Sequence, residues 1–180
     1  RELKALLEPL GFDVASSGEL GLPEPAETET TFKGNALIKA RSACKGSGAP
    51  ALADDSGIEV AALNGAPGVY TADWAGEPRD FMRAMERVEK EMQASGSSDR
   101  SARFVCTLAL VWPDGEEAVF RGEVSGHLVW PPRGDRGFGY DPVFVAEGET
   151  ETFGEMDPDK KHVMSHRADA FAKLKAALLS

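Results

Sequence analysis

Two polar clusters that lie far apart in the chain carry the residue types that could do chemistry. The first is Asp54-Asp55-Ser56-Gly57, which follows a short apolar run, and the second is Ser165-His166-Arg167, which precedes an amphipathic segment. A carboxylate pair can hold Mg²⁺ through its oxygen atoms, whereas the start of a helix that carries His and Arg can hold a phosphate or an electron-rich base edge. Together the two clusters indicate a nucleotide enzyme.

The first cluster offers a metal site but leaves its geometry open. Asp54 and Asp55 are consecutive, so in a regular strand their side chains point to opposite faces and cannot both reach one ligand. Gly57 indicates a bend that brings the backbone close to another group, and Ser56 offers a hydroxyl and an N–H to a phosphate oxygen. Glu27, in the loop before a basic helix, could complete the metal site. The alternative is a polar turn between two strands.

The second cluster lies at the start of the last predicted helix. Ser165 suits the N-cap position, which puts His166 and Arg167 in the first helical turn. Basic residues there oppose the helix dipole unless an anion or an electronegative ligand lies between them and the helix end. The pattern therefore favours a binding site, with a solvated surface as the alternative.

A third candidate is the glycine-rich segment Gly137-Phe138-Gly139-Tyr140-Asp141-Pro142. Its two aromatic residues can offer a ring face on which a base stacks, and its carboxylate can accept a hydrogen bond from a base N–H. The alternative is that the aromatic rings fill the core beneath a turn. Spacing alone leaves both interpretations open.

Composition limits the fold and the partners. A chain of 180 residues with 42% hydrophobic residues can bury one core, or one core with a small second lobe over a cleft, so we expect one domain over residues 1–180. The net charge of −10 argues against nucleic acid or an anionic membrane as a partner, although residues 160–175 are locally basic. No apolar run approaches the roughly 20 residues that span a bilayer, which makes the cytoplasm the expected compartment.

Hydrophobic periodicity predicts the elements that must position these residues. Apolar spacing to Leu10 predicts a helix that Gly11 ends, and Thr31 suits the N-cap of a second helix. The predicted order is α/β with an extended mixed β-sheet flanked by helices. The further predicted elements are a short strand at Phe12–Ala15, a helix at Phe32–Lys45, strands on either side of a polar break at Asp54–Gly57, a helix from Phe81 to Met92, a ribbon of Ala102–Trp112 and Ala118–Trp130, a strand at Val143–Ala146, a connection at 147–164, and a helix at Ala168–Leu179.

Five motifs together are similar, in order and spacing, to those of the inosine triphosphate pyrophosphatase family. The similarity covers essentially the whole chain, and five ordered motifs are far more specific than any one of them. The motifs are Thr31-Phe32-Lys33-Gly34-Asn35-Ala36, Ala53-Asp54-Asp55-Ser56-Gly57, Gly65-Ala66-Pro67-Gly68-Val69-Tyr70, Phe138-Gly139-Tyr140-Asp141-Pro142 and Ser165-His166-Arg167.

The resemblance implies an activity and a fold. It implies hydrolysis of the non-canonical purine nucleotides ITP, dITP and XTP to the monophosphate and pyrophosphate, with Mg²⁺ as cofactor. It also implies a homodimer whose subunits have two lobes around a central cleft. The substrate is then a small nucleotide.

The same resemblance assigns the phosphate end of the site. Asp55 resembles the family's catalytic acidic residue and metal ligand, and Asp54 supports it. Glu27 is the best match to a second metal carboxylate in the preceding loop. Ser56 resembles a serine that contacts the substrate, and Asn35, inside the first motif, is expected to support the site.

The base end is assigned in the same way. The segment Phe138-Gly139-Tyr140-Asp141 matches the one that stacks on and reads the purine. Lys161, His166 and Arg167 match the basic residues that bind the base.

One departure from the family concerns the N-terminus. Relatives begin with an apolar strand and a Thr/Ser-Gly-Asn-x-x-Lys loop that cradles the triphosphate, and this sequence begins just after that point, so we expect the strand and the loop to be missing. Two alternative functions stay open, and the absence of the loop favours the second of them. One is a Maf-like pyrophosphatase of modified nucleotides, and the other is a non-catalytic nucleotide-binding module.

Overall fold

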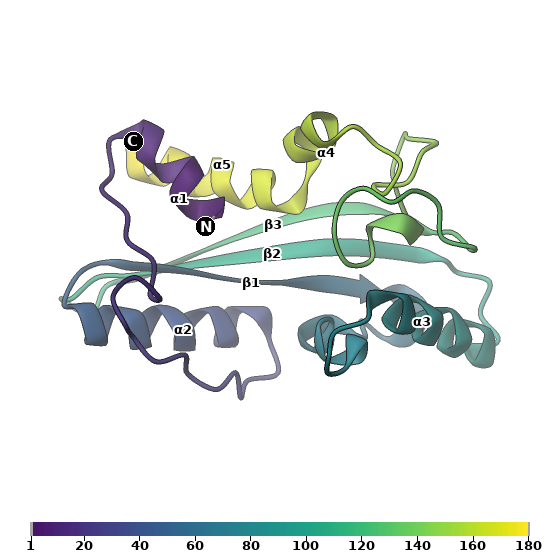
Figure 1. Cartoon of the computed structure of the whole chain (residues 1–180), viewed down its shortest axis with the longest axis horizontal. Coiled ribbons are helices and arrows are strands. Elements are labelled where there is room, and N and C mark those ends of the chain that lie inside the picture. The colour runs from purple at the N-terminus through teal and green to yellow at the C-terminus, as the bar shows by residue number, and fades with distance from the viewer. Residues whose placement is uncertain (1, 180) are drawn as a thin grey trace.

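The chain is built around one extended β-sheet. Its structure, a computed structural model, describes residues 2–179. The helices and strands are α1 (Glu2–Leu7), α2 (Phe32–Ser47), β1 (Ala51–Val60), α3 (Phe81–Ser95), β2 (Ser101–Val111), β3 (Glu117–Leu128), β4 (Phe144–Ala146), α4 (Pro158–Met164) and α5 (His166–Leu179). The strands form a four-stranded sheet in the order β1-β2-β3-β4, and Figure 1 shows α2 and α3 on one side of it and α1, α4 and α5 on the other. The predicted α/β class, with helices that flank an extended sheet, is confirmed.

Strand pairing differs from the prediction in one respect. The sequence pattern predicts a mixed sheet, whereas every pairing between the described strands is antiparallel. The reason lies in the connections, because each one reverses the chain direction. The excursion through α3 brings β2 back along β1, and a tight turn at Gly115, with a φ of +95°, sends β3 back along β2.

The polar cluster of residues 54–57 does not interrupt the sheet. The predicted break between two strands is wrong, because β1 runs continuously from Ala51 to Val60 and pairs with β2 along its whole length. Backbone hydrogen bonds to β2 hold these residues extended whatever the polarity of their side chains. The predicted close approach at Gly57 is confirmed, since a Cβ there would lie 2.6 Å from the carbonyl oxygen of Gly68.

Helix caps are where the sequence predicts structure best. The Thr31 hydroxyl accepts a hydrogen bond from the N–H of Gly34 (3.0 Å), as predicted for the start of α2. The Ser165 hydroxyl accepts one from the N–H of Ala168 (3.2 Å), which confirms it as the cap of α5.

Two predicted segments are corrected. The predicted strand at Phe12–Ala15 has no partner among the described strands and is irregular. The predicted connection over residues 147–164 contains α4, which begins at Pro158 behind an Asp157 carboxylate that accepts from the N–H of Asp159 (2.9 Å). Proline at the first helical position and an aspartate cap are both start signals for a helix.

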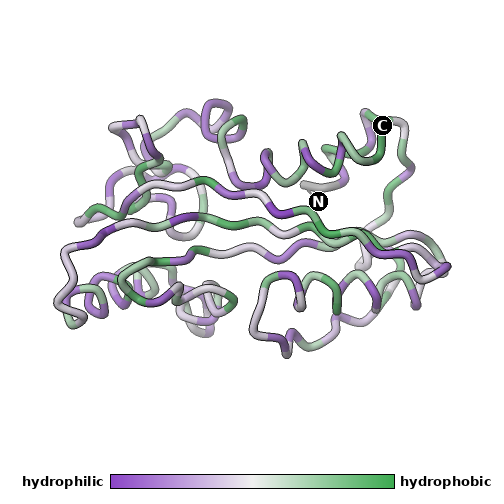
Figure 2. Tube along the Cα trace, turned by 180° about the vertical axis from the view of Figure 1, so that it is seen from behind, coloured by the Kyte–Doolittle hydropathy of each residue, from purple (hydrophilic) through white to green (hydrophobic). Residues whose placement is uncertain are grey.

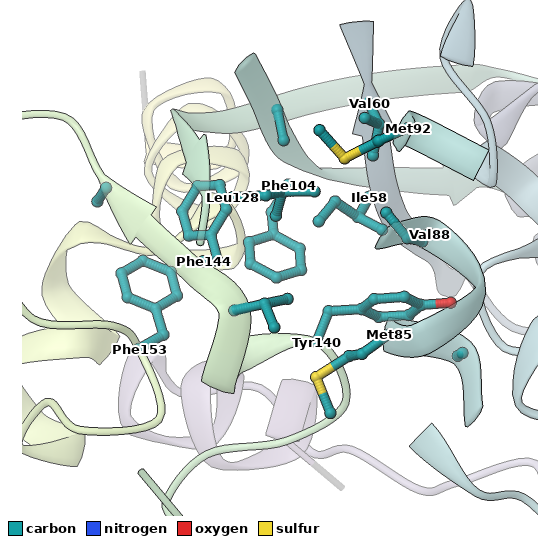
Figure 3. Packing of buried hydrophobic residues seen from close by; sticks show 14 of the residues in the cluster. Ile58, Val60, Met85, Val88, Met92, Phe104, Leu128, Tyr140, Phe144 and Phe153 are labelled. Carbon is teal, nitrogen blue, oxygen red and sulfur yellow. The ribbon is translucent and has the colours of Figure 1, made fainter. Parts of the chain in front are cut away.

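Three apolar clusters divide the molecule into two lobes, with apolar residues along the strands and on one side of the helices (Figure 2). In the first lobe, α2 packs on one face of the strands and α1 and α5 pack on the other, through residues such as Ala40 and Leu174. In the second lobe, α3 and β4 enclose the largest cluster, which contains Phe104, Phe144 and Phe153 (Figure 3). The strands β1, β2 and β3 run through both lobes, so they fix the cleft between them.

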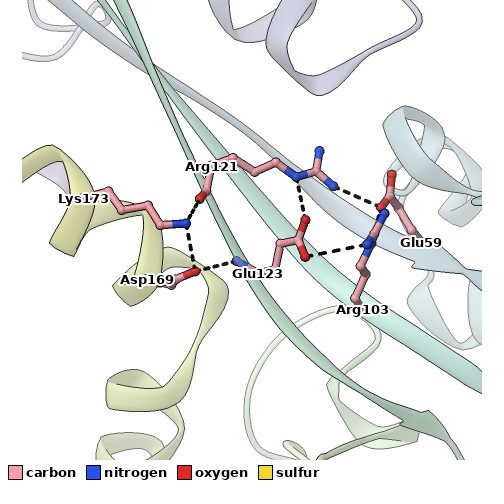
Figure 4. A network of polar contacts seen from close by, with 6 residues as sticks. All are labelled: Glu59, Arg103, Arg121, Glu123, Asp169 and Lys173. Carbon is pink, nitrogen blue, oxygen red and sulfur yellow. Dashed lines mark hydrogen bonds and ion pairs between the residues drawn. The ribbon is translucent and has the colours of Figure 1, made fainter.

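Helix α5 is bound to the middle of β3. Figure 4 shows that the Asp169 carboxylate accepts from the N–H of Glu123 (3.0 Å) and that the Lys173 ammonium donates to the carbonyl of Arg121 (2.6 Å). The helix comes so close that a Cβ on Gly122 would lie 2.2 Å from the backbone of His166. These contacts fix where the first turn of α5 meets the sheet. None of the helices described in residues 2–179 is long and apolar enough to cross a membrane.

Candidate active site

A cleft of about 550 Å³ between the two lobes brings together most of the residues predicted to bind substrate. This volume lies within the range of small-molecule sites. The predicted residues that line the cleft are Asp54, Ser56, the segment Phe138–Asp141, Lys161, His166 and Arg167. The structure therefore places parts of both polar clusters and of the glycine-rich segment around one space, whereas Asp55, Glu27 and Asn35 lie outside its lining.

On the cleft side of β1, Asp54 joins the sheet to α5. Its Oδ2 accepts a hydrogen bond from the Ser56 hydroxyl (3.1 Å) and lies 3.5 Å from the Arg167 guanidinium. Ser56 follows Asp54 by two residues, which places both side chains on the same face of the strand. This face of β1 therefore presents a carboxylate, a hydroxyl and a guanidinium to the cleft.

Asp55 points to the other face of β1, as the strand geometry predicts. Only 8% of the surface of this residue is exposed, and its Oδ1 lies 3.6 Å from the Lys39 ammonium. The other oxygen, Oδ2, is buried without a hydrogen-bond partner in the part of the chain that the structure describes. Because β1 is an edge strand of the described sheet, groups on both of its faces remain near one edge.

Lys39 links Asp55 to the loop that carries Glu27. Its ammonium lies 2.8 Å from the Glu27 carboxylate and donates to the backbone carbonyl of Asp54 (2.5 Å). The sequence motifs do not single out Lys39. The available signal is its spacing, since Lys39 lies four residues after Asn35 on α2 and such residues share one helix face.

Asn35 holds the loop in place. Its side-chain oxygen accepts from the N–H of Glu29 (2.9 Å), and its amide donates to the carbonyl of the same residue (3.3 Å). A buried amide with both ends bonded to one loop residue fixes the path of that loop. Its predicted supporting role thus has a physical basis, since it positions the segment with Glu27.

Burial and charge alter the acid–base properties of this group. Burial raises the pKa of Asp55 to about 6, an effect that the nearby Lys39 ammonium partly opposes. Burial alone would lower the pKa of Lys39, but the hydrogen bond that its ammonium donates to Glu27 and the charge of Asp55 outweigh burial, and the net shift of the pKa is upward. The Asp55 carboxyl is therefore poised close to neutral pH, beside an ammonium that stays charged.

The donor set fits a magnesium ion. No group of three His, Cys, Asp or Glu side chains with metal-binding geometry occurs among residues 2–179. Magnesium, however, usually binds through one or two carboxylates and completes its shell with water and substrate phosphates. Asp55 and Glu27 meet at one cation, the Lys39 ammonium, and Asp55 keeps an unpartnered buried oxygen. Both observations are consistent with a place that accepts a cation.

Phe138 is the aromatic residue available for stacking. Its side chain is 72% exposed, and its ring meets that of Phe81 edge to face at 5.1 Å. The turn around it is held by the Asp141 carboxylate, which accepts from the N–H of Phe138 (2.7 Å). Gly137, with a φ of +76°, leaves the room that this carboxylate needs, because a Cβ there would lie 2.2 Å from it.

Tyr140 and Asp141 are buried, with 2% and 4% of their surface exposed. The Tyr140 hydroxyl donates to the backbone carbonyl of Thr71 (2.8 Å), and its ring belongs to the core of the second lobe. The core interpretation of the glycine-rich segment therefore holds for Tyr140, and the stacking interpretation holds for Phe138. Burial raises the pKa of Asp141, although the Lys161 ammonium that bonds to it acts in the opposite direction.

His166 faces the cleft as a neutral imidazole. Its ring stacks on that of Phe104, with centroids 5.1 Å apart. Burial, and then the charges of Arg167 and Lys161, lower the pKa of His166 to about 3. Its Nδ1 is buried with no hydrogen-bond partner within the described residues. A neutral ring with an unpartnered nitrogen can exchange a hydrogen bond with a ligand.

Comparison with known proteins identifies the family. The model of the Ham1 family matches residues 1–177. The chain belongs to the Ham1 family. The resemblance drawn from the five motifs is thereby confirmed.

Two curated members are highly similar to this Ham1-family chain. It is 58% identical to a dITP/XTP pyrophosphatase of Caulobacter vibrioides over 177 residues, which cover 98% of this chain and 91% of the relative. It is 54% identical to a dITP/XTP pyrophosphatase of Zymomonas mobilis over 180 residues, covering 99% of this chain and 86% of the relative.

Solved Ham1 structures share the fold. A HAM1 protein from Coxiella burnetii superposes with a TM-score of 0.94 at 39% identity and covers 99% of this chain and 91% of its own. A nucleoside-triphosphatase / dITP/XTP pyrophosphatase from Mycobacterium abscessus gives a TM-score of 0.80 at 40% identity, covering 96% of this chain and 90% of its own. The α/β class predicted from the sequence, with helices that flank an extended sheet, agrees with these structures.

Proposed function

We propose that the chain hydrolyses non-canonical purine nucleoside triphosphates, such as dITP, XTP and ITP, to the monophosphate and pyrophosphate. The observation that carries this proposal is the cleft, whose lining brings the exposed Phe138 ring and the base-reading donors to the edge strand β1, where Asp54 lines it and Asp55 is the next residue. The names of the curated relatives, dITP/XTP pyrophosphatases, support the same activity.

In this proposal, Asp55 is the catalytic carboxylate. As a carboxylate at the edge of the sheet, it can accept a proton from the attacking water. The water oxygen bonds to the α-phosphorus, the bond from the α-phosphorus to the bridging oxygen breaks, and pyrophosphate leaves with the electron pair. Asp54 and Lys39 hold this strand edge, and Ser56 offers a donor to the phosphate oxygens.

Magnesium is the cofactor of the proposed reaction. Asp55 and Glu27 would hold the ion. When bound, Mg²⁺ supplies charge neutralisation for the phosphate groups. Lys39 occupies the space between the two carboxylates in this structure, and its ammonium supplies positive charge there.

Selectivity in this proposal comes from the other end of the cleft. Phe138 stacks on the purine, and Lys161, His166 and Arg167 present donors toward the 6-keto oxygen of hypoxanthine or xanthine. Adenine has an amino group at that position, so donor would face donor. A site built to hydrogen-bond one group rejects an analogue that leaves its buried partners unsatisfied.

The proposal also covers the remaining expectations from the sequence. The resemblance supports a homodimer, and the continuous sheet supports one domain over residues 1–180. An enzyme that removes faulty nucleotides meets them where nucleotides are used, so we place it in the cytoplasm. Sedimentation of the purified protein tests the dimer directly.

The test of the function is product identification with the full-length protein. We expect pyrophosphate and the monophosphate from ITP, dITP and XTP, and loss of product when EDTA removes the divalent ion. Release of orthophosphate would contradict the proposal. Turnover of modified pyrimidine nucleotides alone would also contradict it and would favour a Maf-like enzyme. Binding of ITP without any product would favour the non-catalytic module.

A further inference from the structure

Through Thr71, the loop over residues 65–71 contacts both β1 and the base-reading segment. Thr71 is the last residue of this loop and lines the cleft, and its hydroxyl makes two hydrogen bonds. Its hydroxyl accepts from the N–H of Ile58 (3.0 Å) and donates to the carbonyl of Gly68 (2.6 Å). Thr71 thus ties the loop to β1 beyond the residues that carry the carboxylates.

This contact explains the glycine of the first polar cluster. A Cβ on Gly57 would lie 2.6 Å from both the Gly68 carbonyl and the Thr71 hydroxyl. Real Cβ atoms do not approach so closely, so only glycine lets Thr71 reach β1 here. Gly57 follows Ser56 directly, which places the contact next to the catalytic side of the cleft.

The backbone of Thr71 connects to the base end. Its carbonyl accepts the hydrogen bond of the Tyr140 hydroxyl (2.8 Å). Burial raises the pKa of Tyr140, so the hydroxyl remains a neutral donor. Figure 3 shows the Tyr140 ring among the apolar residues of the second lobe, beside Met85. Phe81 contacts the rings of both Tyr140 and Phe138, with centroids 5.9 Å and 5.1 Å apart.

We propose that Thr71 and Tyr140 are positioning residues that couple the base-reading segment to the catalytic strand β1. This inference rests on the proposed function and adds to it a connection between recognition and chemistry. The path runs from β1 at Gly57 and Ile58, through Thr71, to Tyr140 and the neighbouring Phe138. A misplacement of about 1 Å in a reacting group can lower the rate about a hundredfold. A link between the two segments can therefore determine which nucleotide is placed well enough to react.

The first test uses the two tyrosines of the chain. Tyr140→Phe removes only the hydroxyl that bonds to Thr71, whereas Tyr70→Phe removes an exposed hydroxyl and serves as the matched control. We expect Tyr140→Phe to lower the ITP-to-ATP ratio of kcat/KM by at least about tenfold, mainly through a higher KM for ITP. Tyr70→Phe should leave the ratio unchanged.

The second test uses Thr71, whose hydroxyl can be removed at constant shape. Thr71→Val should narrow the same ratio, and Thr71→Ser, which keeps the hydroxyl, should restore it. If both residues act through one link, the double variant Tyr140→Phe/Thr71→Val should lose no more selectivity than the worse single variant. Should Thr71→Val fail to fold, the comparison of the two tyrosine variants still decides.

The outcomes separate this inference from the proposed function. The wild-type protein must first release pyrophosphate from ITP, and its failure to do so would remove the proposed function itself. If the wild type is active and Tyr140→Phe lowers the melting temperature while ITP and ATP lose kcat/KM by the same factor, the bond is only structural and the inference is overturned. If Tyr140→Phe lowers kcat/KM for ITP while the KM for ATP stays at the wild-type value, the inference is supported.

Discussion

At the scale of residues, the site depends on neighbours in sequence that face opposite ways. Asp54 turns to the cleft and Arg167, and Asp55 turns to Lys39 and Glu27. Strand alternation predicts this division from the sequence. The closeness of Lys39 to both carboxylates could not be predicted, because the path of the loop that carries Glu27 depends on the buried bonds of Asn35.

The first prediction concerns the two aspartates. Asp55→Asn keeps the size of the side chain and removes its charge, so we expect kcat to fall by at least about a hundredfold, as for the loss of a metal or general-base role. Asp54→Asn should have a smaller effect and serves as the matched control. Steady-state kinetics with ITP at several Mg²⁺ concentrations checks this, and unchanged turnover and Mg²⁺ dependence in Asp55→Asn would place the metal elsewhere.

The second prediction concerns Arg167, which we assign to the base. Arg167→Ala should raise the KM for ITP and narrow the ITP-to-ATP ratio of kcat/KM, because the bond that breaks lies at the α-phosphorus. Helix content measured by circular dichroism should not change, since Ser165 still caps α5. An equal loss of kcat for both nucleotides would instead make Arg167 a phosphate ligand, as its ion pair with Asp54 also allows.

At the scale of elements, local signals predict the starts of α2 and α5 and the β2–β3 turn, whereas tertiary contacts decide the pairing and burial of the strands. Thr31 and Ser165 cap helices as expected, because a cap depends only on residues within one turn. The polar residues 54–57 predict an interruption between two strands, but all four pair with β2 within one continuous strand. The motif predicts that Tyr140 contacts the purine base. Its ring is instead buried in the core of the second lobe, which is formed by residues from several distant segments.

The third prediction tests how α5 is held on the sheet. Gly122→Ala would push a Cβ to within 2.2 Å of the backbone of His166 and Ala170, so we expect a loss of about 1–3 kcal/mol in the free energy of unfolding. Activity with ITP should fall as well, because α5 carries His166. Gly18→Ala, where a Cβ meets only a serine oxygen at 3.8 Å, is the control. Equal denaturation midpoints for the two variants would contradict the close packing.

The fourth prediction concerns pH and the start of β2. A hydrogen bond from Arg100 (2.7 Å) lowers the pKa of Glu89, a buried carboxylate on α3, below its ordinary value. A depressed carboxylate pKa stabilises the fold above the unfolded pKa of about 4.3, and this contribution is lost as pH falls through the folded pKa. The difference in melting temperature between wild type and Glu89→Gln should therefore be constant near neutral pH and shrink below about pH 4.3.

A surface pair provides the control for this measurement. Glu91→Gln removes an exposed partner of Arg87 on the same helix and should change the melting temperature little at any pH. A wild-type-minus-Glu89→Gln difference that stayed constant through acid pH would show that the Arg100 pair does not contribute to folding.

At the scale of the whole molecule, a chain with a net negative charge places several positively charged side chains at the cleft. The chain has a net charge of −10, yet Lys161 and Arg167 line the cleft together with Arg79. Three strands that run through both lobes keep this charge at a fixed distance from the carboxylates of β1. The sequence could predict the local basic segment, but the cleft exists only because the lobes pack on opposite ends of one sheet.

The central claim is that one cleft reads the purine and cleaves the triphosphate. The most direct measurement is the ratio of kcat/KM for ITP to that for ATP, determined from pyrophosphate release by the full-length protein with Mg²⁺. We predict a ratio of at least about a hundred, because a mismatch at the 6-position leaves donors unsatisfied. Equal turnover of ITP and ATP would contradict the account.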